Sequence, residues 1–383
     1  MRYLYLFIML FNLGCSKDYN KNPLPNILSS NHPKIKRVMD SLENHEIQIK
    51  LSEITKNDKG EIAFKDYEFQ VNDSTYFYPA STVKLPIAIL ALEKVEELEN
   101  ITSLTPFHID GDSITTTLRK EIEAIFAVSS NEACNRLIEF LGFDYINGKL
   151  KSKQLQPVRI AHRLSAPNSD DLVTKAVNFI ENDAIVYKQL PINSQQIRPL
   201  ILNRIKKGKG YYKDSVLVNE PMDFSLKNYL PITIQSEIMK RLQFPNLYEY
   251  SQQFHLNDSD YNFLIDVMQK LPYELGYDKS IYNDGYVKFF MYGDTKEDIP
   301  DHINIHNKVG DAFGYLMDNA YIVDTKYNVS FLVTATIHVN RNGIFNDDDY
   351  EYDSIGFPFL AELGRQLHSY YIEKELYLDK HRD

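Results

Sequence analysis

The sequence predicts an α/β (α+β) fold, in which one antiparallel sheet is built from a hairpin near the N-terminus and strands near the C-terminus and is packed with helices. Residues 47–51 alternate apolar and polar side chains, and a turn signal at 57–60 separates them from a second strand-like run at 62–71. Three more strand-like runs stand near the C-terminus, whereas the chain in between is mainly helical in pattern. Two such sets of strands can join one sheet that helices cover, beside an all-helical region.

The individual elements follow from periodicity and residue type. The stretch 85–98 is rich in Leu, Ile and Ala and predicts a buried helix. Other helical patterns occupy residues 33–42, 120–128, 132–141, 231–242, 258–271 and 355–376. The C-terminal strand-like runs are 303–308, 319–324 and 329–339, of which the last is rich in β-branched residues. Residues 183–229 fit neither pattern and are set apart as an atypical segment.

The composition excludes several classes of protein. Of 383 residues, 43% are hydrophobic and 25% are charged, a balance typical of a globular chain with a large core. Lys and Arg number 42 against 53 Asp and Glu, so the net charge of −11 argues against a nucleic-acid partner. Cys15 and Cys134 are the only cysteines, too few for a disulfide framework or a cysteine-rich metal site.

The first residues have the pattern of an export signal. The apolar run at 3–13 is shorter than the about 20 residues that a transmembrane helix needs, and it fits a signal peptide. Its end, Asn12-Leu13-Gly14-Cys15, resembles a bacterial lipoprotein cleavage box, although Asn12 stands where that box usually carries Leu. We therefore expect Cys15 to be lipidated, and the alternatives are a plain secretory signal or a buried N-terminal strand.

Ser81 and Lys84 form the one Ser-x-x-Lys of the chain, at the start of the predicted helix 85–98. The i, i+3 spacing puts both side chains on one helix face. A serine hydroxyl becomes a good nucleophile only when a base takes its proton, and a lysine whose pKa is lowered by burial can be that base. The alternative is an N-capping serine with a solvated lysine, but the apolar helix that follows favours a position of Lys84 beside a core.

With two further motifs, the chain resembles the class A serine β-lactamases and the related penicillin-binding serine hydrolases. Those enzymes carry Ser-x-x-Lys, Ser-Asp-Asn and Lys-Thr-Gly in that order. The corresponding stretches here are Ser81-Thr82-Val83-Lys84, Ser129-Ser130-Asn131 and Lys308-Val309-Gly310. The order and the setting of the motifs match over most of residues 33–376, which implies a β-lactamase/transpeptidase-like fold.

The resemblance also implies a role for each motif residue. Ser81 would be the acylated nucleophile and Lys84 the acceptor of its proton. Ser129 would pass a proton to the leaving nitrogen, and Asn131 would orient Lys84 and the substrate amide. Lys308 would attract the substrate carboxylate. Taken alone, Ser129 and Asn131 could instead be helix caps, and Lys308 a charge on an edge strand.

The oxyanion hole would use the backbone N–H groups of Ser81 and Asp311, and Val309 and Gly310 would line the substrate site. Val309 departs from the family because a threonine hydroxyl there helps to hold the β-lactam carboxylate. Losing a hydrogen bond to a charged group costs about 1.5–3 kcal/mol. Ser130 in place of the family's Asp is a milder departure.

The residue that would free the acyl-enzyme is the least defined. In class A enzymes a Glu-x-x-Leu-Asn segment between the second and third motifs supplies this base, and the chain has no such segment. Residues 162–171 stand at roughly the right position. Asp170 or Asp171 could replace the missing Glu, although two acids in a loop or at a helix N-cap are the plainer interpretation.

Three other groups have simpler interpretations. His302 and His306 have a spacing that suits a metal on a helix, but they fall in a strand-like run, where residues i and i+4 are about 13 Å apart. The acid run 347–349 could bind a cation and is better interpreted as an exposed loop. The basic cluster 206–209 could face an anionic glycan or lipid and is better interpreted as a solvated loop.

We therefore expect a serine hydrolase that forms an acyl-enzyme at Ser81 with a β-lactam or a related amide or ester. Two alternatives stay open. One is a binding lipoprotein of this fold with weak or no turnover, and the other is a peptidase that releases D-Ala from cell-wall peptides. The substrate would be a small β-lactam or a cell-wall peptide, bound by a monomer that needs neither metal nor cofactor.

The expected organisation has four parts. These are a signal peptide at 1–14, the lipidated cysteine with a polar tether at 15–32, a β-lactamase-like catalytic domain at 33–376 that includes the atypical segment, and a tail at 377–383. A lipid anchor implies an exported bacterial protein, either periplasmic or held at the outer membrane. Such a protein would touch a membrane only through its lipid.

Overall fold

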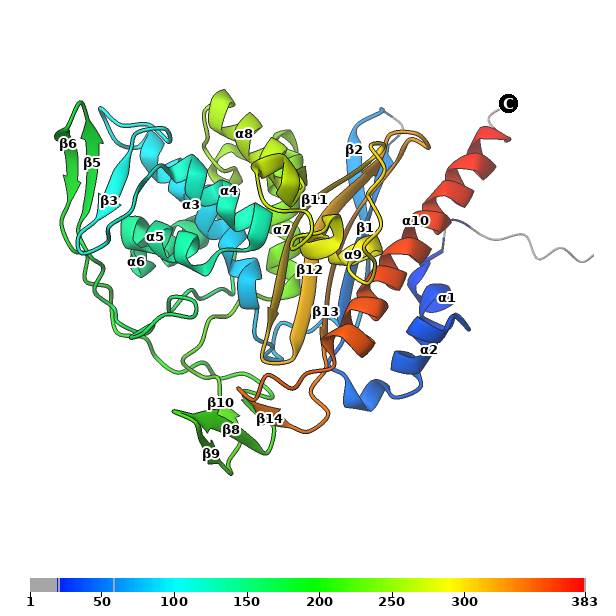
Figure 1. The fold of residues 1–383 in the computed structure, drawn as a ribbon. Coiled ribbons are helices and arrows are strands. Elements are labelled where there is room, and N and C mark those ends of the chain that lie inside the picture. The colour runs from blue at the N-terminus through cyan, green and yellow to red at the C-terminus, as the bar shows by residue number, and fades with distance from the viewer. Residues whose placement is uncertain (1–18, 20, 58, 382–383) are drawn as a thin grey trace, which may run out of the picture.

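A five-stranded antiparallel sheet runs through the molecule (Figure 1). The computed structural model describes residues 19, 21–57 and 59–381. The strand order is β11-β12-β13-β1-β2, and every neighbouring pair is antiparallel. These strands are β1 (Gln48–Lys56), β2 (Ile62–Phe69), β11 (Ile303–Ala312), β12 (Tyr315–Asp324) and β13 (Val329–His338). The N-terminal hairpin thus joins the C-terminal strands, and the predicted fold class is confirmed.

One face of the sheet is covered by helices from both ends of the chain: α1 (Leu24–Leu28), α2 (Pro33–Met39) and the long α10 (Phe357–Asp379) (Figure 1). Their apolar side chains share a core with the strands and with α9 (Phe289–Tyr292). This packing arises because each helix carries an apolar stripe, such as Leu360, Leu363 and Leu367 on α10.

Two expected boundaries differ from the structure. Residues 24–28 were expected in a polar tether, but Leu24, Ile27 and Leu28 are buried in the core shared with α10. Their i, i+3, i+4 spacing makes one apolar helix face, and this short pattern is hidden among prolines and asparagines. At the other end, α10 continues into the expected tail and ends at Asp379. Residues 1–14 and Cys15, which carry the export and lipidation predictions, lie outside the described residues.

The other face of the sheet packs against α7 (Ile232–Gln243) and α8 (Asp258–Gln269), and beyond them lies a helical region (Figure 1). That region contains α3 (Lys84–Glu96), α4 (Leu118–Val128), α5 (Asn131–Leu141) and α6 (Phe143–Ser152). The helix α3 is its centre, because all of its residues from Lys84 to Val95 are buried. A second apolar core joins these helices to α7, α8 and a small sheet.

That small sheet has the order β4-β3-β5-β6 and stands at the far end of the helical region. Its strands are β3 (Phe107–Ile109), β4 (Thr115–Thr116), β5 (Val177–Glu181) and β6 (Ala184–Gln189). None of these strands, nor α6, was predicted. The strands are short and draw partners from distant parts of the chain, so each lacks a clear local pattern.

The atypical segment 183–229 also forms strands that depend on distant partners. After β6 it supplies β7 (Lys206–Lys207), β8 (Gly210–Lys213), β9 (Val216–Val218) and β10 (Met222–Asp223). The strand β8 pairs in parallel with β14 (Ile344–Phe345), more than a hundred residues away in sequence, to give a sheet of order β14-β8-β9. The segment is therefore tied to the loop that follows β13.

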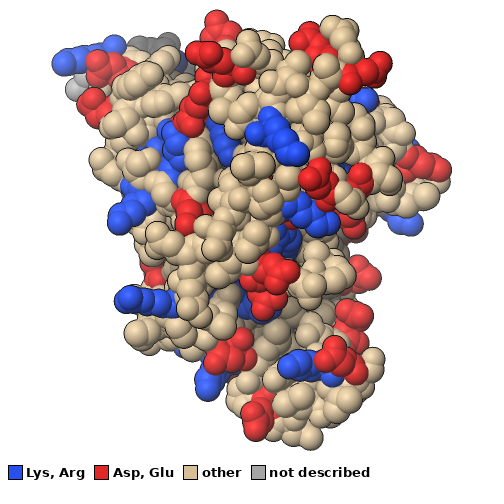
Figure 2. All heavy atoms as spheres, turned by 90° about the vertical axis from the view of Figure 1, so that its left-hand side faces the viewer, with Lys and Arg blue, Asp and Glu red and all other residues tan. Residues whose placement is uncertain are grey.

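Two further features of the molecule are the apolar character of its helices and the distribution of charge on its surface. No helix in the described part of the chain combines the length and the apolar character that crossing a membrane requires. Figure 2 shows the face that lies on the left of Figure 1, and acidic and basic side chains are interspersed over it. The negative net charge is therefore not gathered into one acidic area on that face.

Candidate active site

Ser81 lies in a short 3₁₀ turn, η2 (Ala80–Val83), that leads directly into α3. Ala80 has a φ of 45°, in the left-handed region that alanine seldom adopts. Ser81 is half-buried, whereas Ala80 and Thr82 on either side are buried. The chain therefore bends just before the helix and presents one hydroxyl at the surface of an otherwise buried turn.

Gly310 lets strand β11 approach this turn closely. A Cβ at position 310 would lie 2.9 Å from the backbone nitrogen of Ser81 and 3.0 Å from that of Thr82. These contacts are with backbone atoms, so a larger residue would force the strand or the turn to move. The glycine of the third motif thus brings β11, and with it Asp311, beside Ser81.

The hydroxyl of Ser129 lies between the two motif lysines. Lys308 Nζ donates to Ser129 Oγ at 2.9 Å and to the Val309 carbonyl oxygen at 2.9 Å. Lys84 Nζ donates to the same Oγ at 3.2 Å and also to the Ser129 carbonyl oxygen. A hydroxyl oxygen can accept two hydrogen bonds, so its own proton stays free for a third partner. This arrangement suits a group that relays protons.

Burial makes both lysines easier to deprotonate. It lowers the pKa of Lys84 to about 8, because the charged amine loses its hydration and the nearby Cys134, Asp311 and Glu132 only partly compensate. Burial, and then repulsion from Lys84, hold the pKa of Lys308 well below its usual range. A neutral amine, which can accept a proton, is therefore accessible near neutral pH.

The second motif joins two helices, as predicted. Ser129 ends α4 with a φ of 53°, and Asn131 begins α5. The side chain that caps α5 belongs to Ser130, whose Oγ accepts from the Ala133 N–H at 3.2 Å. Because Ser130 performs the capping, the side chain of Ser129 is left to contact the lysines.

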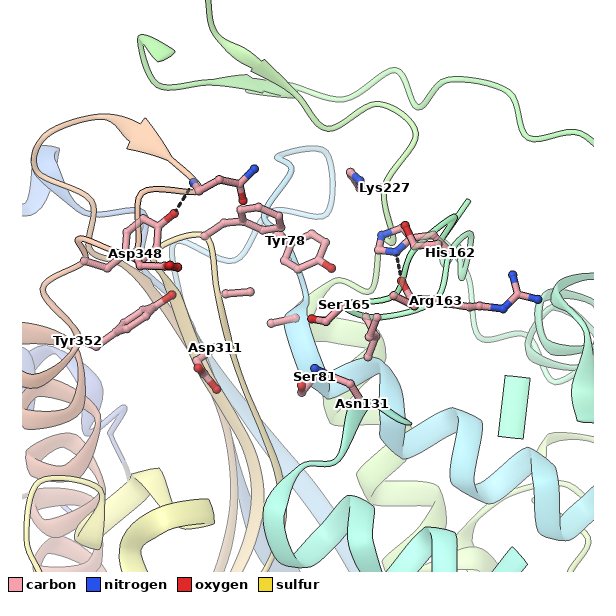
Figure 3. Close-up of a pocket in the computed structure, with 18 residues that line it drawn as sticks. Tyr78, Ser81, Asn131, His162, Arg163, Ser165, Lys227, Asp311, Asp348 and Tyr352 are labelled. Carbon is pink, nitrogen blue, oxygen red and sulfur yellow. Dashed lines mark hydrogen bonds between the residues drawn. The ribbon is translucent and has the colours of Figure 1, made fainter. Parts of the chain in front are cut away.

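A cleft of about 550 Å³ opens at Ser81 (Figure 3). Ser81 and Asn131 lie at its base, Asp311 and Tyr352 come from one side, and Ser165 and His162 come from the other. The remaining residues around the cleft are Tyr78, Ala80, Arg163, Leu164, Ala166, Ser169, Lys227, Ala312, Phe313, Asn346, Asp348 and Tyr350. A volume of this size is typical of a site for a small molecule.

The structure gathers the five predicted catalytic residues, with Gly310 and Asp311, at the cleft or just behind it, and it places Val309 and the two predicted deacylation acids elsewhere. Lys84, Ser129 and Lys308 lie behind the base of the cleft, where Ser81 and Asn131 line it. Val309, predicted to line the substrate site, is instead 2% exposed and packs in the apolar core on the α10 side of the sheet.

The predicted deacylation acids do not line the cleft. Asp170 and Asp171 are both exposed, and the carbonyl oxygen of Asp171 accepts from Arg163 Nη1 at 2.6 Å. Their segment does reach the cleft, but through other residues, among which Ser165 points into it (Figure 3). The only carboxylates among the described cleft residues are Asp311 and Asp348.

Several cleft residues were not predicted. Lys227 comes from the atypical segment, and Asn346, Asp348 and Tyr350 come from the loop after β14. The acid run 347–349 was visible in the sequence but was interpreted as an exposed loop. Asp348 is indeed exposed, but it faces the cleft. Only the pairing of β14 with β8 brings this loop there.

The structure also describes the surroundings of His306 and of the basic cluster. His306 stacks on Tyr321 and its Nδ1 lies 3.1 Å from the Ile265 carbonyl oxygen, and the described residues contain no group of three or more potential metal ligands. The basic cluster is only partly solvated, because Lys207 is 5% exposed and pairs with Glu46 at 2.7 Å.

Residues 34–185 match the sequence model of the beta-lactamase enzyme family. The resemblance noted from the motifs is thereby confirmed, and the matched range contains the first two of them. No curated protein matches the chain in sequence.

The chain is also similar to several solved structures. A β-lactamase from Sphaerobacter thermophilus aligns with a TM-score of 0.51 and 14% identity, covering 92% of this chain and 98% of the other. A class A β-lactamase from Mycobacterium abscessus has a TM-score of 0.48 and 13% identity, covering 86% and 97%. A PBP-A mutant in its acyl-enzyme complex with penicillin G has a TM-score of 0.49 and 13% identity, covering 90% and 97%. The first likeness shows that the chain has the β-lactamase fold, and with the family match it supports a hydrolase of the serine β-lactamase kind.

Proposed function

We propose that this protein is a serine hydrolase that forms an acyl-enzyme at Ser81 with a β-lactam or a related amide or ester. The observation that carries the proposal is the contact of Ser129 Oγ with both Lys84 and Lys308, just behind the base of the open cleft that Ser81 lines. Two buried amines around one hydroxyl provide a route for protons, which a serine that only caps a helix does not need.

In the acylation step, Ser81 Oγ attacks the carbonyl carbon of the substrate. The neutral amine of Lys84 takes up the proton of Ser81, and Ser129 delivers a proton to the leaving nitrogen or oxygen as its bond to the carbonyl carbon breaks. The backbone N–H groups of Ser81 and Asp311 would hold the oxyanion, because Gly310 keeps the two backbone segments in contact.

Release of the acyl group is the slower half of the proposed reaction. A water molecule must be activated to hydrolyse the ester, and no acid from residues 162–171 lines the cleft. We therefore expect the acyl-enzyme to accumulate. The same observation favours the second candidate, a protein that is acylated or binds its ligand without efficient turnover. Hydrolysis of a chromogenic cephalosporin over many cycles, lost on Lys84→Ala, would reject that candidate.

The proposal is tested by labelling the purified protein with a fluorescent penicillin. We expect the wild type to carry the label and Ser81→Ala to carry none, with Thr82→Ala as a matched control because the Thr82 hydroxyl only bonds the Pro79 carbonyl and a sulfur nearby. Mass spectrometry of the intact protein would locate the adduct. No adduct on the wild type, together with no hydrolysis of β-lactams or simple esters, would contradict the proposal. Release of D-Ala from cell-wall peptides would identify the peptidase alternative.

We further propose that Cys15 anchors a monomeric protein to a membrane by its lipid, outside the inner membrane of a bacterium. The nine residues from Cys15 to the start of α1 can span about 30 Å when fully extended, so the body would stay close to the lipid surface. In cells, Cys15→Ala should move the protein from the membrane fraction to the soluble fraction. An unchanged membrane fraction would contradict lipidation at this residue.

A further inference from the structure

We propose that Asp311 determines the specificity of the cleft by its charge. It selects acyl compounds that place a cationic or uncharged group beside β11, and it disfavours those that place a carboxylate there. This inference rests on the proposed acylation of Ser81. It concerns the substrate class and departs from the expectation that Lys308 attracts a substrate carboxylate. It also implies that a penicillin, which carries a carboxylate, acylates Ser81 more slowly than a matched uncharged compound does.

The position of Asp311 follows from the close packing of β11 on Ser81. Gly310 touches the backbone of Ser81, and Asp311 is the next residue along the strand. Its side chain lines the cleft, is exposed, and forms no hydrogen bond or ion pair with any described residue (Figure 3). A substrate held with its carbonyl group at Ser81 would therefore meet an unpaired carboxylate on this side.

Lys308, the cation expected to bind a substrate carboxylate, is not accessible from the cleft beside β11. Lys308 is 2% exposed, does not line the cleft, and donates to Ser129 Oγ and the Val309 carbonyl oxygen. Val309, which stands in place of a threonine hydroxyl, turns its side chain into the core. The charge that a substrate can reach on this wall is thus the negative one.

The surroundings of Asp311 support this assignment. Lys84 and Lys308, behind the cleft, interact electrostatically with it. So do Tyr286, in the short helix 284–287, and Tyr352, at the start of the helical turn 352–356. Although Asp311 is accessible to water, the walls of the cleft raise its pKa, and the two lysines only partly offset this effect. None of the described residues forms a hydrogen bond or an ion pair with the carboxylate, which leaves it free to contact a ligand.

The rest of the cleft has the same polarity on this side. Asp348 lies on the same wall as Asp311 (Figure 3). Of the basic residues that line the cleft, Arg163 is occupied by a buried ion pair with Glu139, with Nε to Oε1 at 2.6 Å. Lys227 forms no ion pair with a described residue, but it lies near His162 on the other side. A cationic group beside β11 would therefore be attracted, and a carboxylate would be repelled.

Three matched thioesters of phenylacetylglycine test the proposal. Their leaving thiols are thiocholine, mercaptoacetamide and thioglycolate, which place a cation, a neutral amide or a carboxylate next to the reacting carbonyl group. In each case Ser81 Oγ forms the new ester bond, the C–S bond breaks, and the proton of Ser81 leaves with the thiol. A thiol-specific chromogenic reagent follows the release, which gives kcat/KM for each ester.

We expect the wild type to prefer thiocholine over mercaptoacetamide and mercaptoacetamide over thioglycolate. In Asp311→Asn, which keeps the size of the side chain, the thioglycolate ester should gain about tenfold relative to the amide, and the thiocholine ester should lose about tenfold, as one unit charge in a partly solvated site predicts. Asp348→Asn should give a smaller shift in the same direction. Asp214→Asn is the control, because Asp214 is exposed on the β8–β9 hairpin and does not line the cleft.

The outcomes separate this inference from the proposed function. If release depends on Ser81 but the wild type prefers thioglycolate, or if Asp311→Asn leaves the ratios unchanged, the specificity assignment is wrong and the acylation proposal stands. If no ester reacts in a Ser81-dependent way, the acylation proposal fails. In that case, calorimetric binding of the three esters to Ser81→Ala, with and without Asp311→Asn, still decides whether Asp311 sorts ligands by charge.

Discussion

The two ends of α3 carry two buried lysines with the same altered acidity and different surroundings. Burial lowers the pKa of both Lys84 and Lys94 to about 8. Lys84, at the start of the helix, contacts Ser129 beside the cleft. Lys94, in the last turn, donates to the Phe140 carbonyl oxygen and to Gln189 Oε1, and its Nζ lies 4.5 Å from the centre of the Phe140 ring.

A lowered pKa alone therefore does not mark a lysine as a catalytic group. Both lysines lose hydration and can become neutral near pH 8. Only Lys84 has a hydroxyl, a second lysine and an open cleft within reach, whereas the partners of Lys94 are a carbonyl and an amide in a closed core. The function of each lysine is set by its neighbours.

The strongest test replaces each lysine by methionine. Lys84→Met should lower the rate of penicillin acylation about a thousandfold, within the range that a general base contributes. Lys94→Met should leave the rate within about twofold, because its surroundings contain no reacting group. The second-order acylation rate measured with fluorescent penicillin checks both. Equal losses in the two variants would mean that Lys84 acts only through the stability of α3.

A second test compares the adjacent serines of the second motif. Ser129→Ala should slow acylation about a hundredfold, because it removes the hydroxyl that contacts Lys84 and Lys308. Ser130→Ala removes the cap of α5 and should cost about 1 kcal/mol of unfolding free energy with little change in acylation. Denaturant unfolding and acylation rates are measured on both variants. The opposite assignment of effects would make Ser129 a structural residue.

The pH dependence of acylation gives a smaller effect. Lys84 must be neutral to take the proton of Ser81, and its pKa is about 8. Below that value the neutral fraction falls about tenfold per pH unit, so the acylation rate should rise with pH and level off above about pH 9. Acylation rates of the wild type, measured between about pH 6 and pH 9.5, check this prediction, because the range spans the titration of Lys84 on both sides of its pKa. A flat profile would exclude Lys84 as the proton acceptor.

The last test concerns stability, where the two lysines should behave alike. The pKa of Lys94 is about 8 in the folded chain against 10.5 for the unperturbed side chain. Between these values the unfolded chain holds one more proton, so the unfolding free energy rises with pH, by at most about 1.4 kcal/mol per unit. Over this window, the unfolding free energy of the wild type should therefore rise relative to that of Lys94→Met. It should rise in the same way relative to that of Lys84→Met. A difference that stays constant with pH would mean that Lys94 keeps its ordinary pKa.

The sequence predicted the parts of the site that have a local pattern. The spacing of Ser81 and Lys84, the helices on both sides of Ser129, and the strand that carries Lys308 all follow from periodicity over short stretches. The joining of the hairpin to the C-terminal strands was also predicted, because apolar faces at both ends of the chain need a common core.

The sequence did not predict which distant loops complete the cleft or the direction of particular side chains. Asp348 reaches the cleft because β14 pairs with β8, and this contact between distant segments leaves no local signal. Val309 was assigned to the substrate site by its place in the motif, but its side chain packs in the core. Asp170 and Asp171 were chosen by position in the chain, and the loop turns them away from the cleft.

The sequence by itself determined the chemistry that is on offer, since the order of three motifs and the pattern of helices and strands specify a serine, two lysines and a sheet to hold them. Only the tertiary structure decided how that chemistry is used. It placed Lys84 and Lys308 on one hydroxyl, left Lys94 in a closed core, and put Asp311 in the wall of the cleft that opens at Ser81. The physical reason is that local patterns select secondary structure, whereas pKa values and accessible charge depend on which distant residues exclude water.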